Sequence, residues 1–253
     1  MHPAKRLART AGLLYLVVVV AGIFALMYVP AQLKIGSDPA AAMASIIAQE
    51  GLYRAGIAAS LVCYLAFLLL PLALYRLLSP YGRGAASVMV ALAVASVPLS
   101  FANVGHRLEV LNLISDAGYL RGIAPDVLAQ QVMLSLKAYS KGMILNQVFW
   151  SLWLAPFGYL VFKSGILPKL LGILLMVGSA GYALEAFGHI LVADFAALPG
   201  ADLLSIPASL GEIGTCLWLC IMGAYNSDTK SHGSKNEISP GTFPAEHQEQ
   251  LHQ

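Results

Sequence analysis

The sequence predicts an all-α fold, a polytopic transmembrane helical bundle with six transmembrane helices and short interfacial helices. The chain of 253 residues is 58% hydrophobic and only 11% charged, whereas a soluble domain is about 45–50% apolar and about 25% charged. Six continuous apolar runs are each long enough to span a bilayer, which takes roughly 20 residues. Backbone in lipid must satisfy its own hydrogen bonds, so each run is a helix, and continuous runs exclude the alternating strands of a barrel.

The first predicted span follows a basic segment, residues 1–10. Its apolar run from Ala11 to Val29 is longer than the about 7–15 residues of a signal-peptide core. We therefore expect an uncleaved first transmembrane helix. The six predicted spans are about residues 10–30, 53–78, 84–110, 139–162, 167–192 and 204–225.

The links between the spans differ in kind. Residues 79–84 and 163–165 form tight turns, so the second and third spans, and the fourth and fifth, are predicted to be antiparallel hairpins. Residues 37–39 read Ser-Asp-Pro, which is typical of a helix start, and predict a short interfacial helix that ends near Gly51. Pro125 and Asp126 begin a second amphipathic segment, which we expect to run straight into the fourth span.

Domain organisation and orientation follow from composition. Residues 1–225 are predicted to form the six-helix transmembrane domain, and the polar residues 226–253 a disordered cytoplasmic tail. Nine Lys and Arg side chains lie in the N-terminus, the two tight turns and the tail, against six on the other side, in longer segments. Because basic residues favour the cytoplasmic side, both termini are predicted there, in a multi-pass protein of the cell inner (plasma) membrane.

One hairpin carries a family resemblance. Residues 157–172, FGYLVFKSGILPKLLG, resemble the signature of a bacterial membrane family known as domain-of-unknown-function family 4386. Residues 9–22, 36–39, 53–54 and 74–76 are similar to that family too. The resemblance covers roughly residues 5–225. It implies a helical integral membrane protein and no particular activity.

Polar residues inside the spans are the candidate site. Ionisable groups in a spanning helix are costly, so they usually face the bundle interior, a cavity or a partner. Counting about 1.5 Å per residue from the predicted outer boundary places them at one level, in the outer half of the membrane. The candidate polar cluster, ligand-binding or structural, is Asn103, His106, Arg107, Asn146, Gln147, Glu185, His189 and Glu212.

Helical spacing predicts how this cluster is assembled. Residues three or four apart share a face, which gives three small or polar stripes that we expect to turn toward each other. Charge balance then predicts Arg107 within salt-bridge reach of Glu185 or Glu212, directly or through one water. The stripes are Ser96, Ser100, Asn103 and Arg107; Gly178, Gly181, Tyr182, Glu185, Gly188 and His189; and Ser205, Ser209, Glu212 and Cys216.

Three interpretations of the cluster remain open at this stage. It is a structural network, a pocket open to the outer side that binds a small polar or lipid ligand, or the centre of a membrane-embedded, metal-dependent lipid hydrolase. His106, Glu185, His189 and Glu212 are suitable metal-ligand types, but the second His of an H-E-x-x-H motif is missing. We favour a non-enzymatic role in binding, sensing or transport.

Other classes of function have little support in the sequence. A net charge of +2 gives no nucleic-acid signal, and three Cys in apolar runs do not form a disulfide framework. We find no phosphate loop, dinucleotide fingerprint or nucleophile elbow. No catalytic residue, metal or cofactor is assigned. The expected partners are membrane lipids and a small-molecule or lipid ligand.

Overall fold

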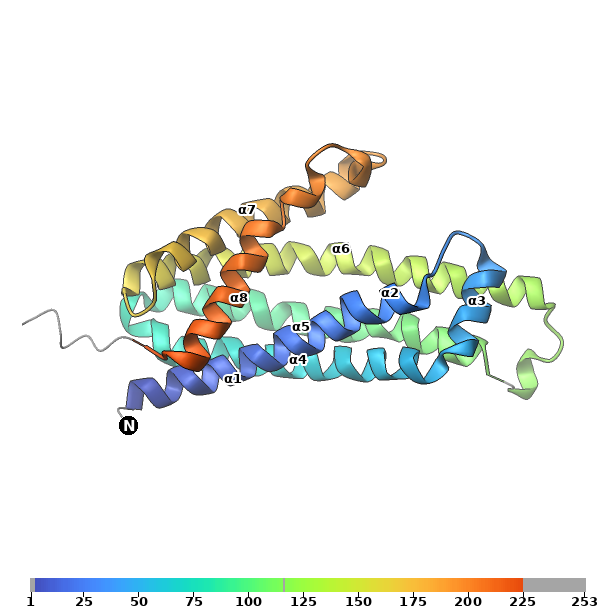
Figure 1. Cartoon of the computed structure of the whole chain (residues 1–253), viewed down its shortest axis with the longest axis horizontal. Coiled ribbons are helices and arrows are strands. Elements are labelled where there is room, and N and C mark those ends of the chain that lie inside the picture. The colour runs from blue at the N-terminus through green and yellow to red at the C-terminus, as the bar shows by residue number, and fades with distance from the viewer. Residues whose placement is uncertain (1–2, 116, 225–253) are drawn as a thin grey trace, which may run out of the picture.

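A computed structural model describes residues 3–115 and 117–224, and in these residues the chain forms helices and no strand. Six helical segments are long and apolar enough to cross a membrane, which confirms the predicted number. They lie along one another as an elongated bundle (Figure 1). The predicted tail, 226–253, lies outside the described residues.

The first span is a compound helix: α1 (Pro3–Ile23) continues through a π-helical turn (Phe24–Tyr28) into α2 (Val29–Leu33). Pro30 has no N–H to donate to the preceding turn, and its ring would clash with the carbonyl four residues back. The widened turn just before it relieves that clash. The other five spans are α4 (Glu50–Leu78), α5 (Arg83–Leu113), α6 (Pro125–Ser164), α7 (Lys169–Leu191) and α8 (Ile206–Ile221).

The predicted links are confirmed. Asp38 caps the short helix α3 (Pro39–Ala48) by accepting hydrogen bonds from the Ala40 and Ala41 amides. The α4–α5 turn is the 3-10 segment Ser79–Tyr81, and Gly165, with φ +62°, ends α6 before the α7 turn. The segment that begins at Pro125 runs without a break into the fourth span. Short 3-10 turns lie at Gly118–Leu120, Phe195–Ala197 and Ala201–Leu203.

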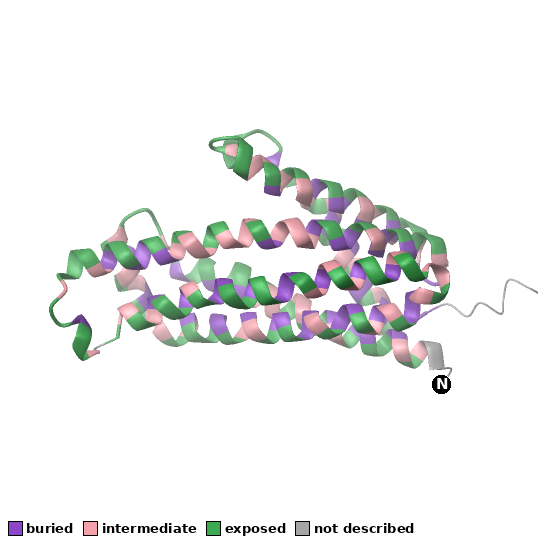
Figure 2. Ribbon diagram, turned by 180° about the vertical axis from the view of Figure 1, so that it is seen from behind, coloured by how far each residue is buried: buried purple, intermediate pink, exposed green. Residues whose placement is uncertain are grey.

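The helices differ greatly in length. At 1.5 Å per residue, the 40 residues of α6 span about 60 Å, whereas the 16 residues of α8 span about 24 Å. The N-terminus and the end of α8 lie at the same end of the bundle, and α6 extends well past the α7–α8 hairpin at the other end (Figure 1). The tip of that hairpin diverges from the remaining helices in both views (Figures 1 and 2).

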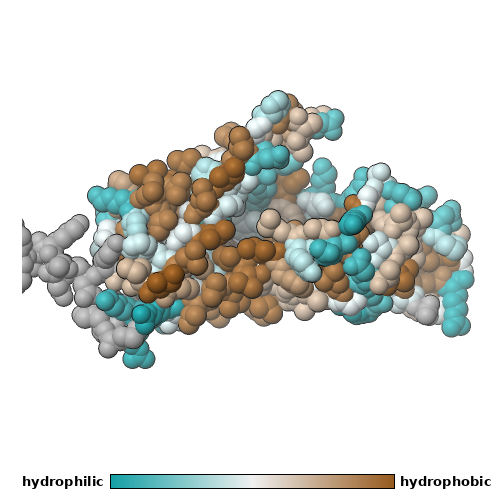
Figure 3. All heavy atoms as spheres, in the orientation of Figure 1, coloured by the Kyte–Doolittle hydropathy of each residue, from teal (hydrophilic) through white to brown (hydrophobic). Residues whose placement is uncertain are grey.

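Close helix crossings are made at glycines. A Cβ on Gly158 of α6 would lie 2.7 Å from the Gly172 carbonyl oxygen of α7, and one on Gly12 of α1 would lie 2.7 Å from the Cys220 amide of α8. Small residues let helix backbones approach this closely in membranes. Many large apolar side chains point outward, including Leu13, Leu65, Leu184, Leu210 and Ile221. They give α7, α8 and the adjacent part of α1 the largely hydrophobic surface of Figure 3, as lipid contact requires.

Candidate functional site

Glu212 occupies the middle of α8 and is half-buried. Its Oε1 accepts a hydrogen bond of 3.1 Å from the Tyr15 hydroxyl of α1, and its Oε2 accepts one of 3.4 Å from the Tyr182 hydroxyl of α7. Both donors are neutral phenols. The carboxylate therefore joins three helices without meeting a positive charge.

Glu185 lies one turn beyond Tyr182 on α7, so the two side chains share a face. Its Oε2 accepts a hydrogen bond of 2.9 Å from Nε2 of Gln147 on α6. We call Tyr15, Gln147, Tyr182, Glu185 and Glu212 the carboxylate cluster. It brings together three of the sequence-predicted residues, from α6, α7 and α8, and joins them to α1.

Neither carboxylate of this cluster forms an ion pair within the described part of the chain. The two ion pairs found there are Glu50–Arg54, at 2.6 Å, and His106–Glu109, at 3.7 Å. Both involve partly exposed side chains, near the N-terminal end of α4 and the C-terminal end of α5. The carboxylate cluster thus carries two acidic groups, held by neutral donors, inside spanning helices.

Close packing of α8 positions Glu212. Gly178 and Gly181 of α7 lie directly against Ala208 and Leu204, and a Cβ on either glycine would clash with backbone atoms. The predicted small stripe of the fifth span is therefore confirmed as a packing face. Thr215, one turn beyond Glu212, is fully buried and its hydroxyl has no hydrogen-bond partner among the described residues.

Arg107 lies elsewhere, and the predicted direct salt bridge is wrong. The side chain is 4% exposed, and its Nη1 donates a hydrogen bond of 3.2 Å to the Ser60 hydroxyl of α4. The guanidinium carbon lies 5.0 Å from the ring centroid of Tyr53 and 5.3 Å from that of Tyr139. These are cation–π distances. We call Ser60, Tyr53, Arg107 and Tyr139 the arginine site.

The two sites are separated along the bundle axis. A Cβ on Gly56 would lie 2.8 Å from Nη2 of Arg107 and 3.0 Å from the Val29 side chain, so Arg107 lies at the level of Val29. Glu212 lies at the level of Tyr15, which is 14 residues, or about 21 Å, earlier along the first span. The prediction of one common level is therefore wrong. It assumed that all spans reach the same boundary, but α5 and α6 extend beyond α7 and α8.

The remaining predicted residues stay outside both sites. Asn103 is buried on α5 and donates a hydrogen bond of 3.0 Å to the Tyr139 carbonyl. Asn146 is fully buried on α6, and neither side-chain atom has a hydrogen-bond partner in the described part. His106 pairs with Glu109, and His189 packs its ring edge-on against Phe195 at 5.2 Å.

The three polar stripes do not converge as predicted. Ser96, Ser100, Asn103 and Arg107 are all buried, as expected of an interior face, but Arg107 and Asn103 contact α4 and α6. Glu212 instead contacts α1 and α7. Ser209 is exposed, so the buried face of α8 runs through Ala208, Gly211 and Thr215.

Sequence reasoning missed the tyrosines that complete both sites. Tyr15, Tyr53 and Tyr139 each lie in an apolar helical run and read there as ordinary lipid-facing or packing residues. The position of a Tyr on its helix could have identified it. A buried Tyr normally has a hydrogen-bond partner for its hydroxyl, so a Tyr on the same helix face as small residues is a candidate partner for a charged group inside the membrane.

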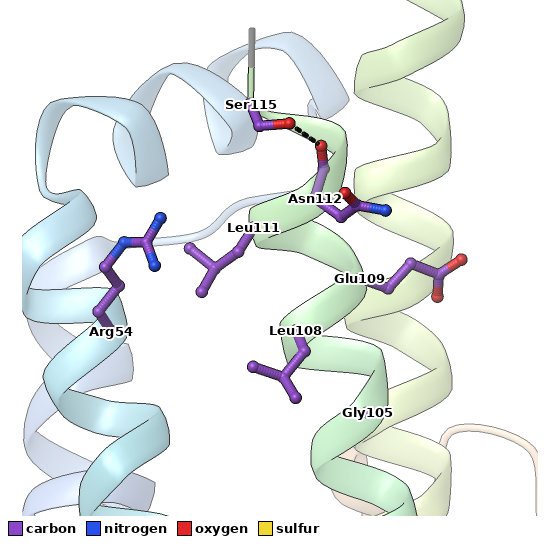
Figure 4. Close-up of a pocket in the computed structure, with 7 residues that line it drawn as sticks. All are labelled: Arg54, Gly105, Leu108, Glu109, Leu111, Asn112 and Ser115. Carbon is purple, nitrogen blue, oxygen red and sulfur yellow. Dashed lines mark hydrogen bonds between the residues drawn. The ribbon is translucent and has the colours of Figure 1, made fainter. Parts of the chain in front are cut away.

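A shallow pocket of about 580 Å³ lies between the N-terminal part of α4 and the C-terminal end of α5 (Figure 4). In this view Arg54 of α4 faces Leu108 and Leu111 of α5 across the opening, while Glu109 points away toward α6. Asn112 and Ser115 line its outer part. The pocket contains none of the carboxylate cluster residues, and Arg54 and Leu108 are the direct chain neighbours of Tyr53 and Arg107 of the arginine site.

No group of three or more His, Cys, Asp and Glu side chains that could hold a metal ion occurs within residues 3–115 and 117–224. His106, Glu185, His189 and Glu212 are held by different partners, as described above. The arrangement is therefore one of isolated carboxylates and a separate guanidinium, each surrounded by neutral hydrogen-bonding groups.

Comparison with known proteins agrees with the fold. No curated protein and no solved structure matches the chain significantly. The family model described as "Domain of unknown function (DUF4386)" matches residues 10–223, which cover all six spanning helices. The match includes every residue of the carboxylate cluster and of the arginine site. The chain belongs to this family of helical membrane proteins of the domain of unknown function 4386.

Proposed function

We propose that this membrane protein binds a small polar molecule or a lipid headgroup at the carboxylate cluster, in a role of binding, sensing or transport. One observation carries the proposal. Glu185 and Glu212 are half-buried in spanning helices, and only neutral Tyr and Gln donors hold them. A ligand with positive charge or several hydrogen-bond donors would compensate the negative charge of these two carboxylates.

The energetics favour a ligand over an isolated pair of charges. A carboxylate at the centre of a spanning helix is unfavourable by about 2.5–3.5 kcal/mol even on the lenient insertion scale. Either each group takes up a proton or an opposite charge approaches it. The protein's own cations do not fill this role, because neither carboxylate has an ion-pair partner in the described residues.

The shape of the bundle offers an approach to this region. Figure 3 shows the surface hollowed between the tip of the α7–α8 hairpin and the helices beside it. Glu185 lies on the outer half of α7, and its partner Gln147 lies on α6, the helix that continues past the hairpin tip. A polar group entering from this side would meet Glu185 first and Glu212 deeper along the hairpin.

Retention of a co-purifying molecule tests the proposal. Wild-type protein purified in mild detergent should retain a small polar molecule or lipid by native mass spectrometry. Glu212→Gln and Glu185→Gln should each weaken its binding about 10- to 100-fold, because each removes a charge-assisted interaction of about 1.5–3 kcal/mol.

Glu109→Gln is the matched control, since Glu109 is exposed on α5 and outside the carboxylate cluster. It should leave retention unchanged. Equal retention by Glu212→Gln, Glu185→Gln and the wild type would contradict the proposal. So would stoichiometric zinc in the purified protein, which would favour the alternative of a metal-dependent lipid hydrolase. No observation in the structure favours that alternative.

We also propose that the protein resides in the bacterial inner membrane with both termini in the cytoplasm. The excess of Lys and Arg on the N-terminal side supports this orientation. Single cysteines placed on a background without the three native ones test it at Gly36, Gly84 and Gly118, where an added side chain meets nothing within 4 Å. In intact cells an impermeant maleimide should label positions 36 and 118 but not 84. Labelling of position 84 but not of positions 36 and 118 would show that the topology is the reverse of the one proposed.

A further inference from the structure

We propose that the arginine site is a second, separate binding site, which takes an oxyanion of the phosphate type from a lipid headgroup or a soluble phosphate. The proposal does not depend on the carboxylate cluster. It rests on the side chains that α4, α5 and α6 bring together around Arg107, and on what those side chains lack.

Arg107 is a buried cation without a counter-anion in the described residues. Its side chain is 4% exposed, and no carboxylate in the described chain lies within ion-pair distance of it. Ser60 accepts one hydrogen bond from Nη1. A guanidinium has five N–H donors in a planar fork, so donors remain for a ligand.

Two further donors lie beside it without an acceptor at normal hydrogen-bond geometry. The Tyr53 and Tyr139 hydroxyl groups are buried, and neither makes a hydrogen bond of normal geometry with a described residue, although Tyr53 lies close to Arg107 and Tyr139 close to Tyr64. Their rings lie 5.0 Å and 5.3 Å from the guanidinium carbon. Buried polar atoms in folded proteins nearly always have a partner. A cation that lacks a counter-anion and two phenol groups that lack a well-placed acceptor indicate a missing group that is negative and rich in acceptor oxygens.

The depth of Arg107 along the bundle indicates which oxyanion lies near it. Arg107 follows Arg83, the first residue of α5, by 24 residues, which is about 36 Å of helix. The hydrocarbon core is about 30 Å thick, and headgroups extend the bilayer to about 40–45 Å. Arg107 thus lies at the level of the far headgroups, where phosphate is the abundant anion, and Arg guanidinium binds phosphate with two parallel hydrogen bonds.

The pocket of Figure 4 lies next to this site on both helices. Arg54 adjoins Tyr53 on α4, and Leu108 adjoins Arg107 on α5. The pocket combines apolar side chains, Leu108 and Leu111, with the exposed Arg54. A lipid at this position would have its acyl chain against the leucines and its headgroup near Arg54, at the same end of α4 and α5 as the arginine site.

Removing the two Tyr hydroxyl groups is the sharpest test. Thermal unfolding of the full chain in nanodiscs should shift upward when phosphatidylglycerol replaces a neutral diacylglycerol, or when inorganic phosphate is added; the first result assigns a lipid source and the second a soluble one. The Tyr53→Phe and Tyr139→Phe double variant keeps both rings and should fold as the wild type does. It should bind the phosphate probe at least about tenfold more weakly, because each lost hydrogen bond is to a charged acceptor.

Arg107→Gln should abolish the shift, and Arg76→Gln, an exposed arginine on α4 outside both the arginine site and the pocket, should retain it. If Arg107→Gln fails to fold, the Tyr→Phe pair still decides the outcome. A wild type that responds to neither phosphatidylglycerol nor phosphate would overturn the proposal. An equal response from the wild type and the Tyr→Phe double variant would overturn it too.

Discussion

A single glycine, Gly142 of α6, sets how Asn103 of α5 sits beside the arginine site. Asn103 donates its hydrogen bond to the Tyr139 carbonyl directly over the bare Cα of Gly142, and a Cβ there would overlap the Asn103 amide. Tyr139 is one of the two rings that contact Arg107. The hydrogen bond of Asn103 to the backbone of Tyr139 therefore depends on the absence of one methyl group.

Gly142→Ala should consequently lower the free energy of unfolding by about 1–3 kcal/mol, the usual effect of adding a methyl group to a filled site. Gly105→Ala on α5 is the matched control, because its Cβ would meet nothing within 4 Å. Alanine there should be neutral or slightly stabilising, since it favours helix. Reversible chemical unfolding in detergent measures both changes, and equal effects would show that Asn103 does not occupy this position.

The residue scale is also where sequence reasoning was least complete. Polar and ionisable residues are rare inside spans, so Arg107, Glu185 and Glu212 could be selected from the sequence alone. Which of them meet depends on helix rotation and axial offset, and both are set by packing between helices. The same packing gives Tyr15 and Tyr182 their role as partners of Glu212; Tyr182 was on the predicted polar stripe of the fifth span, whereas Tyr15 lies in an uninterrupted apolar run.

At the scale of elements, prediction succeeded where local chemistry decides the outcome. Asp38 begins α3 and Gly165 ends α6 because capping and a positive φ have residue-specific requirements. The six spans follow from hydropathy, which depends only on composition over a window. The π-helical turn before Pro30 was not predicted, although the proline that requires it was visible.

The length of α6 explains why the level prediction failed at this scale. The predicted fourth span began at residue 139, but the helix runs unbroken from Pro125. Its first 14 residues add about 21 Å beyond the predicted start. Depth counted from the ends of unequal helices therefore placed Arg107 level with Glu212, although the two lie about 21 Å apart along the bundle.

At the scale of the whole molecule, the charges of the spanning helices are segregated. Arg107 lies among α4, α5 and α6, towards the C-terminal end of α5. The carboxylates lie where α1, α6, α7 and α8 meet. A purely structural network would bring opposite charges together, since pairing lowers the energy of each in a medium of low dielectric. Keeping them apart leaves one site that can accept a cationic or donor-rich group and another that can accept an anion.

A double-mutant cycle between Arg107 and Glu212 tests this separation most directly. The measured quantities are the free energies of unfolding in detergent of the wild type, Arg107→Gln, Glu212→Gln and the double variant. Groups about 20 Å apart should behave additively, so the coupling energy should stay within about 0.5 kcal/mol. A coupling energy of about 2 kcal/mol or more would show that the two charges meet and would contradict the assignment of two separate sites.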